Sequence, residues 1–246
     1  MVEIRSVVSH VLSQLGTSRE ARYYLKQYSS DAELQFAVIK IGGAVLEEEV
    51  ESLASALAFL RNLGLMPIIL HGAGPQLDVA LQEASIETVK RRGLRVTTPE
   101  VMEVARPVIY RANRRLVNAL DEQGVRAQGI QHGVFVCDYL DREELGLVGD
   151  IRKVDLEAVR DVVHRGILPV VACLGESATG QVMNINADIA ARELIWEVKP
   201  HKIIFLTGTG GLLDESGRIF SALGRRTDYD FRISQDWVQS GMPLTL

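Results

Sequence analysis

A lysine inside an apolar run is the first residue in this sequence that could do chemistry. Lys40 stands in the stretch FAVIKIGGAVL, residues 36–46, and Gly42 and Gly43 follow it directly. A buried ammonium is unfavourable by several kcal/mol unless an anionic group meets it. The stretch therefore predicts that Lys40 pairs with an anion, supplied either by the protein or by a ligand.

A second glycine turn suggests that this anion is a phosphate. The run IILHGAGPQLD ends an apolar segment with Gly72, Ala73 and Gly74, and Pro75 follows at the expected first position of a helix. Small residues at such a place let backbone N–H groups approach a phosphate, and the helix N-terminus adds partial positive charge. Glycines can also serve only to make strand-to-helix turns. Two such turns beside one lysine favour a phosphate site that lacks a Walker A motif.

Three further segments carry polar residues that suit a small anionic substrate and a nucleotide. Arg95 lies in KRRGLRVTTPE between Leu94 and Val96, where a guanidinium suits capture of a carboxylate, although a surface arginine on a hairpin fits equally. Asn184, Asn186 and Asp188 alternate before an apolar helix. Capping explains one of them, and three suggest a polar wall from which Asp188 could pair with Lys40. The loop after IIFL is suited to bind a nucleotide. Its residues are Thr207, Gly208, Thr209, Gly210 and Gly211.

Composition narrows the class of protein. The chain has 246 residues, 47% of them hydrophobic, with 27 basic and 32 acidic residues and a net charge of −5. No dense basic block indicates nucleic-acid binding, and no apolar run approaches the roughly 18 residues of a membrane span. Cys137 and Cys173 stand far apart without a CxxC motif, so they are expected to be core thiols, with no metal site. We expect a cytoplasmic protein.

The remaining pattern supplies the elements that must position these side chains. Short β-rich runs alternate with helical stretches, which predicts an α/β fold with an open, mainly parallel sheet sandwiched by helices. The runs cover 36–41, 66–70, 125–130, 167–173 and 202–206, and the helices cover about 47–63, 75–84, 99–123, 155–165 and 186–197. Hairpins are expected in 88–98, 131–154 and GESATGQVMN, and Pro107 is expected to kink or split its helix. An N-terminal helical arm, residues 1–30, precedes one domain over 31–246.

Six motifs in order resemble the amino acid kinase family. They are most similar to N-acetylglutamate kinases, and the arm LGTSREARYYLKQY with HGAGPQLD is closest to the kinase domain of bifunctional N-acetylglutamate synthase/kinases. The resemblance runs from the arm to about residue 241. The motifs are Lys40-Ile-Gly-Gly, His71-Gly-Ala-Gly-Pro, Gly93-Leu-Arg-Val-Thr, Gly146-Leu-Val-Gly, Asn184-Ile-Asn-Ala-Asp and Thr207-Gly-Thr-Gly-Gly.

The resemblance implies ATP-dependent phosphorylation of the side-chain carboxylate of N-acetyl-L-glutamate, in arginine biosynthesis. Lys40 would stabilise the transferring phosphoryl group, and Asp188 would orient the catalytic lysine. The substrate-binding residues would be Ala73, Gly74, Arg95 and Asn184, and the nucleotide-binding residues Gly42, Gly43 and 207–211. Mg²⁺ would arrive with ATP. A carboxylate nucleophile needs no general base, so His71 is expected to make a structural hydrogen bond.

The sequence departs from the family where a second catalytic lysine is expected. Thr245 stands at that position after Gly241-Met242, and the expected domain is incomplete at its C-terminal end, without an acetyltransferase domain. One lost transition-state donor costs about 10²–10³ in rate, so slow turnover is expected. The alternative function is a weak or inactive kinase-like, arginine-sensing regulatory domain of an N-acetylglutamate synthase. A kinase acting on aspartate or glutamate is a further alternative. The motifs HGAGPQLD and NINAD argue against it.

The N-terminal arm bears on partners. Its apolar face can pack on its own domain or on a neighbouring subunit, and the resemblance implies the second arrangement, a homo-oligomer. In relatives with such an arm, arginine feedback acts nearby, so the resemblance also implies L-arginine as a feedback inhibitor.

Overall fold

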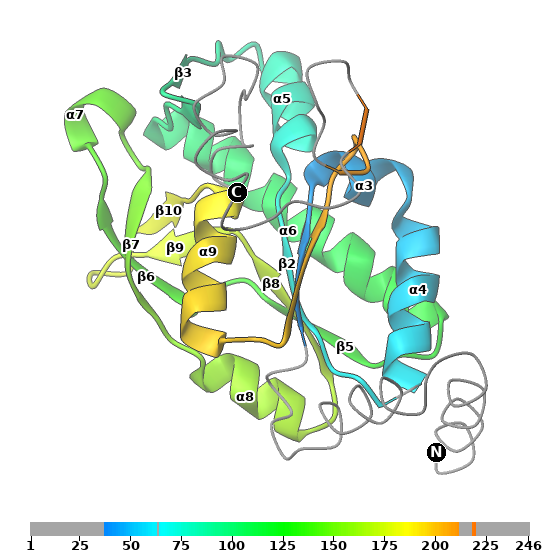
Figure 1. Cartoon of the computed structure of the whole chain (residues 1–246). Coiled ribbons are helices and arrows are strands. Elements are labelled where there is room, and N and C mark those ends of the chain that lie inside the picture. Colours follow the sequence, from blue (N-terminus) through cyan, green and yellow to red (C-terminus); the bar gives the residue numbers. More distant parts are fainter. Residues whose placement is uncertain (1–36, 63, 212–217, 220–246) are drawn as a thin grey trace.

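The computed structural model of the chain describes residues 37–62, 64–211 and 218–219 (Figure 1). The predicted arm and the positions near Thr245 lie outside the described residues. The elements follow in the order β1 (Ala37–Ile41), α3 (Gly43–Glu48), α4 (Val50–Asn62), β2 (Ile68–His71), α5 (Gly74–Glu83), β3 (Lys90–Arg91), β4 (Leu94–Arg95), α6 (Pro99–Glu122), β5 (Ala127–Ile130), β6 (Phe135–Tyr139), α7 (Arg142–Leu145), β7 (Gly149–Val154), α8 (Glu157–His164), β8 (Leu168–Ala172), β9 (Leu174–Glu176), β10 (Val182–Asn184), α9 (Ala187–Val198) and β11 (Lys202–Leu206).

The five predicted β-rich runs form one parallel sheet. Its strand order is β11-β1-β2-β8-β5, and every neighbouring pair in it is parallel. All residues of β1, β2 and β8 are buried, which is why these strands read as apolar runs in which only Lys40 and His71 are polar. Because parallel strands end at one edge, the segments that follow β1, β2, β8 and β11 all begin there.

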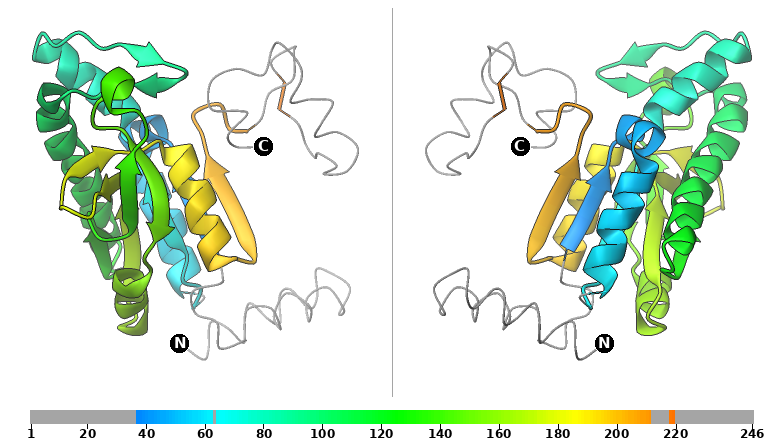
Figure 2. Two further views of the ribbon diagram at one scale, coloured as in Figure 1. Left: turned by 90° about the vertical axis from the view of Figure 1, so that its left-hand side faces the viewer. Right: turned by 90° about the vertical axis from the view of Figure 1, so that its right-hand side faces the viewer.

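Helices cover both faces of this sheet, as the alternation predicts. Figure 1 views the sheet nearly along its edge, with α9 on one side and α4 on the other, and Figure 2 shows the same layers from two sides. The long helix α6 begins at a Thr98 cap and packs on β5 and β8. It is not split at Pro107, which lies inside its span.

A second, four-stranded sheet lies on the side of α9 (Figure 1). Its order is β10-β9-β6-β7, with β6–β7 and β9–β10 antiparallel and β6–β9 parallel. The hairpins expected in 88–98, 131–154 and 175–184 are all present, the first as β3–β4. Their assembly into a separate sheet was not predicted, because the parallel β6–β9 pairing joins segments that are distant in sequence.

Cys137 and Cys173 are core thiols, as predicted. Both are buried and free, and burial raises the pKa of Cys137 to about 11 and that of Cys173 to about 12. Gly175 packs against Cys137, whose Sγ would overlap any Cβ at that position. Both cysteines therefore contribute as small apolar groups in a well-packed interior.

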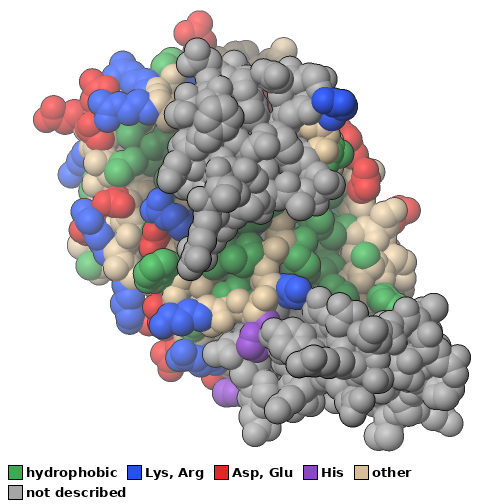
Figure 3. Space-filling view, in the orientation of Figure 1, with side chains coloured by type: hydrophobic (Ala, Val, Ile, Leu, Met, Phe, Trp, Pro, Cys, Tyr) green, Lys and Arg blue, Asp and Glu red, His purple; other side chains and the backbone are tan. Residues whose placement is uncertain are grey.

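The surface carries charged side chains of both signs. On the face shown in Figure 3, Lys and Arg side chains are interspersed with Asp and Glu instead of forming a basic band. No helix in the described part of the chain is both long and apolar enough to cross a membrane.

Candidate active site

Lys40 and Asp188 form an ion pair at the carboxyl edge of the sheet. Lys40 is the fourth residue of β1, and Asp188 lies in the first turn of α9. The two atoms Nζ and Oδ1 are 2.8 Å apart, and the two side chains are only 11% and 16% exposed. The anion required by the buried lysine is thus supplied by the protein, as Asp188 was predicted to do.

The two predicted glycine turns meet each other. A Cβ on Gly43 would lie 2.8 Å from Cδ of Pro75 and 3.1 Å from the backbone nitrogen of Gly74, closer than real Cβ atoms pack. Gln76 Nε2 also donates a hydrogen bond of 2.7 Å to the carbonyl oxygen of Gly43. Within the described ranges, no side chain caps the N-terminus of α5, which leaves its first backbone N–H groups without a capping partner there.

The third predicted loop, 207–211, adjoins the first glycine turn. The Gly42 amide donates to the carbonyl oxygen of Leu206 at 2.8 Å, and a Cβ on Gly208 would touch Ala44. Within the loop, Thr207 and Thr209 join their hydroxyl groups at 3.0 Å, and the Gly210 amide donates to the Thr207 carbonyl. The structure therefore brings all the predicted nucleotide-binding residues to one edge of the sheet.

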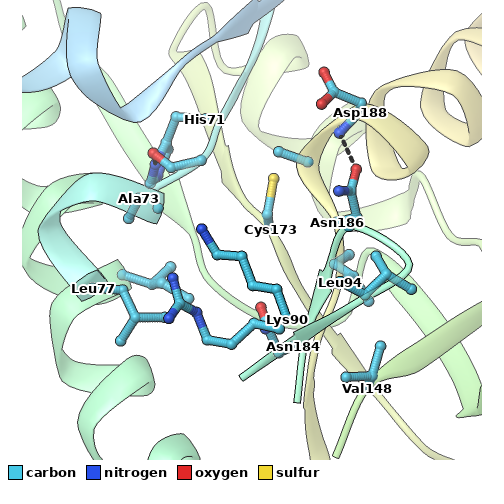
Figure 4. A pocket seen from close by; sticks show the side chains of 17 residues that line it. His71, Ala73, Leu77, Lys90, Leu94, Val148, Cys173, Asn184, Asn186 and Asp188 are labelled. Carbon is cyan, nitrogen blue, oxygen red and sulfur yellow. Dashed lines mark hydrogen bonds between the residues drawn. The ribbon is translucent and has the colours of Figure 1, made fainter. Parts of the chain in front are cut away.

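A cavity of about 220 Å³ opens beside the Lys40–Asp188 pair (Figure 4). It is smaller than the roughly 300–1,000 Å³ typical of pockets for drug-sized ligands, so it suits a small metabolite. Figure 4 places Asp188 at one end of it and Asn184 and Val148 at the other. Its lining includes the predicted residues Ala73, Gly74, Arg95, Asn184 and Asp188. Lys40 and the 207–211 loop lie outside this lining.

Arg95 brings a cationic group to the cavity. Its side chain is 7% exposed, and its Nη2 donates a hydrogen bond to Asp78 of α5. Its Nη1 is buried and has no hydrogen-bond partner among the described residues. Because an unsatisfied buried donor is unfavourable, Nη1 is suited to receive an acceptor atom from a ligand.

Asn186 and Asn184 have different tasks. Asn186 caps α9, since its Oδ1 accepts hydrogen bonds from the backbone nitrogens of Asp188 at 2.8 Å and Ile189 at 3.1 Å. Asn184 ends β10 and donates from Nδ2 to the hydroxyl of Thr97 at 3.1 Å. All three alternating polar residues line the cavity; Asn186 is also a cap, Asp188 pairs with Lys40 and Asn184 bonds to Thr97.

His71 makes the structural hydrogen bond that was predicted for it. Its Nε2 lies 3.0 Å from Nδ2 of Asn113, which also donates to the carbonyl oxygen of Val170. Burial lowers the pKa of His71 to about 4, so the imidazole is neutral at physiological pH. Gly129 leaves room for Asn113, whose Oδ1 would overlap a Cβ there.

Comparison with known proteins identifies the family of this chain. Residues 35–244 match the sequence pattern described as the amino acid kinase family, which spans more than half of the chain. The chain belongs to the amino acid kinase family. The fold and the string of six motifs are those expected from the resemblance.

Individual relatives of this chain are named acetylglutamate kinases. It is 46% identical over 232 residues to one from Xanthomonas campestris, an alignment that covers 94% of this chain and 54% of the relative. It is 33% identical to one from Hydrogenobaculum, covering 83% of this chain and 75% of that one. The chain thus spans about half the length of the first of these curated relatives.

A solved structure is similar over most of the chain. It is an N-acetylglutamate synthase from Neisseria gonorrhoeae, complexed with coenzyme A and L-arginine. The TM-score is 0.70 at 25% identity, and the alignment covers 83% of this chain and 50% of that one.

Two cavity residues were not predicted from the sequence as part of the site. Lys90 lies directly opposite Arg95 in the β3–β4 register, and Figure 4 shows its ammonium extending into the cavity. The turn Arg91-Arg92-Gly93 could have indicated this pairing, because a two-residue turn after Arg91 places Lys90 across from Arg95. Cys173 also lines the cavity, directly after β8, and nothing in its apolar run distinguishes it.

The charges around the cavity leave it weakly cationic. Among the described residues that line it or pair with its lining, Lys40, Lys90 and Arg95 are basic and Asp78 and Asp188 are acidic. The same residues do not form a metal cage, because no group of three or more potential ligands is found in the described part of the chain. The site is therefore arranged for an anionic ligand of small size.

Proposed function

We propose that this chain phosphorylates the side-chain carboxylate of N-acetyl-L-glutamate with ATP, giving the acyl phosphate, as a step of arginine biosynthesis. The observation that carries the proposal is a small cavity whose lining includes both Arg95, with an Nη1 that has no hydrogen-bond partner among the described residues, and Asp188, which pairs with Lys40. The acetylglutamate kinases among the relatives support the choice of substrate.

Arg95 holds the substrate by its α-carboxylate. Asp78 already fixes Nη2 of the guanidinium, so Nη1 points in a defined direction. A charge-assisted hydrogen bond from Nη1 then stabilises the substrate carboxylate. Lys90, across the hairpin, adds a second cation to the same wall. Ala73 and Gly74 form the opposite turn and approach the acyl substrate with their backbone.

Phosphoryl transfer then needs mostly positioning and charge neutralisation. The side-chain carboxylate attacks the γ-phosphorus of ATP, the bond from phosphorus to the β-bridging oxygen breaks, and ADP leaves with that electron pair. The attacking carboxylate is already ionised at neutral pH, so no base is needed and neutral His71 takes no proton. The Lys40 ammonium, oriented by Asp188, stabilises the charge on the transferring group.

The nucleotide lies along the 207–211 loop and the Gly42–Gly43 turn in this proposal. These backbone segments adjoin each other and stand next to Lys40, so their N–H groups can approach the phosphates. Mg²⁺ enters as part of the ATP complex. Among the described residues that line the cavity, Asp188 is the one carboxylate, and Lys40 already engages it, which fits a metal held mainly by phosphate oxygens and water.

An arginine-sensing role is the second candidate function. The similarity to an N-acetylglutamate synthase solved with L-arginine supports it, as does Thr245 in place of the expected second lysine. L-Arginine binding and a homo-oligomer formed through residues 1–30 remain proposals. Deleting residues 1–30 tests both, because the proposals predict a change in oligomer mass and in the response to arginine.

Hydroxamate formation separates the two functions. The chain is incubated with Mg-ATP, hydroxylamine and either N-acetyl-L-glutamate, L-glutamate or L-aspartate, and the acyl hydroxamate is measured. We expect product with N-acetyl-L-glutamate only. Its rate should be about 10²–10³-fold lower than the turnover of about 1–100 s⁻¹ that is typical of kinases. A thermal shift with arginine, together with no shift with ATP and no hydroxamate, would establish the sensor instead. A turnover of 1–100 s⁻¹ would contradict the predicted slow rate.

A further inference from the structure

Thr97 joins the two predicted substrate-binding side chains. It follows β4 and is fully buried, with 0% exposure. Its hydroxyl donates to the backbone carbonyl of Arg95 at 2.9 Å and accepts from Nδ2 of Asn184 at 3.1 Å. A threonine hydroxyl has one proton, so donation to the Arg95 carbonyl leaves only lone pairs for Asn184.

The backbone holds Thr97 firmly in this position. Its nitrogen donates to the carbonyl of Leu145 at 2.9 Å, and its carbonyl accepts from the nitrogen of Leu147 at 2.7 Å. Leu147 in turn accepts from the nitrogen of Asn184 at 2.9 Å. Gly146, with φ of 70°, is required here, because a Cβ would overlap the Thr97 carbonyl oxygen.

This arrangement determines which atom Asn184 shows to a ligand. With Nδ2 on Thr97, the amide oxygen Oδ1 is the free end, and Figure 4 shows the Asn184 oxygen pointing into the cavity. No hydrogen bond to this oxygen is found within the described part of the chain. An amide oxygen accepts a hydrogen bond and repels a carboxylate, so the group opposite Asn184 should be an N–H donor.

We propose that Thr97 is a specificity-determining positioning residue, which turns the Asn184 amide so that its oxygen accepts the amide N–H of an N-acylated amino acid. This rests on the proposed function and assigns the substrate's groups: the carboxylate binds Arg95, and the acylated nitrogen binds Asn184. The hairpin and the Thr97 hydroxyl keep the two binding groups in register, since Arg95 and Thr97 lie two residues apart.

A pair of ligands that differ in one atom tests the assignment. N-Acetyl-L-glutamate carries the N–H, and (S)-2-acetoxyglutarate carries an ester oxygen in its place. The dissociation constants are measured by calorimetry without nucleotide, so turnover does not enter. We expect the wild-type chain to bind the ester at least about tenfold more weakly, because the ester oxygen faces the Asn184 oxygen without a proton between them.

Matched variants locate the effect in Thr97. Thr97→Ser retains the hydroxyl and should retain the discrimination, whereas Thr97→Val removes the hydroxyl, frees the amide to turn and should reduce the discrimination to about threefold or less. Asn184→Ala, at the cavity wall, should abolish it even if Thr97→Val does not fold. Equal affinity of the wild-type chain for both ligands would overturn the inference, as would full discrimination in Thr97→Val or in Asn184→Ala.

The same experiment keeps the two proposals apart. Equal binding of both ligands with phosphorylation of N-acetyl-L-glutamate would overturn the assignment of Asn184 and leave the kinase activity standing. Strong discrimination without any hydroxamate would support the role of Thr97 and overturn the proposed phosphorylation.

Discussion

Asp78 fixes one guanidinium nitrogen of Arg95 and leaves the other, Nη1, buried without a hydrogen-bond partner among the described residues. The same carboxylate lies 3.8 Å from Nζ of Lys90. One exposed acidic residue therefore orients two cations toward the cavity without entering its lining.

Arg95→Lys should weaken substrate binding by about 10–100-fold. A lysine can retain the contact to Asp78 but has no second planar nitrogen for the ligand, and a hydrogen bond to a charged group contributes about 1.5–3 kcal/mol. The affinity for N-acetyl-L-glutamate is measured by calorimetry. Arg91→Lys serves as the control, because Arg91 is half exposed and pairs with Glu144 on the surface. An unchanged affinity in Arg95→Lys would exclude Arg95 from the substrate site.

Gly43→Ala should destabilise the fold by about 1–3 kcal/mol, because its Cβ would lie 2.8 Å from Cδ of Pro75 and force the two glycine turns apart. The free energy of unfolding is measured with urea. Gly74→Ala is the matched control, since nothing lies within 4 Å of a Cβ there and alanine is the better helix former. Equal stability of the two variants would show that the turns do not need their close approach.

His71 should make stability depend on pH between about 6.5 and 4. Its pKa is lowered from 6.5 to about 4 in the folded chain, so the unfolded chain binds the extra proton within this window. Stability is therefore complete above pH 6.5 and falls as the pH is lowered, by about 1.4 kcal/mol per unit from this group.

The pH dependence is measured as the free energy of unfolding at several pH values in three proteins. His71→Gln should lose this contribution to the slope, while His201→Gln, at an exposed position, should retain it. A slope in His71→Gln as steep as that of the wild-type chain would mean that His71 is not held neutral by burial.

The sequence predicted what local pattern controls. Apolar runs indicated β1, β2 and β8, and glycine placement indicated the turns that carry the site. The pairing of Asp188 with Lys40 was predicted because a buried lysine needs an anion and Asp188 begins a helix at the same edge. These inferences need only the pattern of apolar residues and glycines along the chain and the charge of Lys40.

Long-range relations could not be predicted in the same way. The contact of Thr97 with Asn184 joins residues 87 positions apart, and the second sheet depends on the β6–β9 pairing of Phe135 with Gly175, which are also far apart in sequence. Pro107 was expected to kink or split its helix; α6 is not split there, since packing on β5 and β8 stabilises the helix despite the lost hydrogen bond. Tertiary contacts decided all three outcomes.

Lys40→Met should separate the structural role of the pair from its chemical role. Alone, Lys40→Met leaves Asp188 unpaired at 16% exposure and should reduce the free energy of unfolding by about 2–4 kcal/mol, and Asp188→Asn should also destabilise the fold. The double variant, without either charge, should recover about 1–3 kcal/mol relative to the sum of the single changes. The exposed pair of Arg91 and Glu144 is the control, with an expected coupling below about 1 kcal/mol.

Activity should not follow stability in this series. If Lys40 stabilises the transferring phosphoryl group, hydroxamate formation falls by about 10²–10³ in Lys40→Met and stays equally low in the double variant, although that variant regains stability. Recovery of activity together with stability would show that the pair only supports the fold. A rate of hydroxamate formation that remains low in the double variant, although its stability has recovered, would therefore show that Lys40 acts in the chemistry.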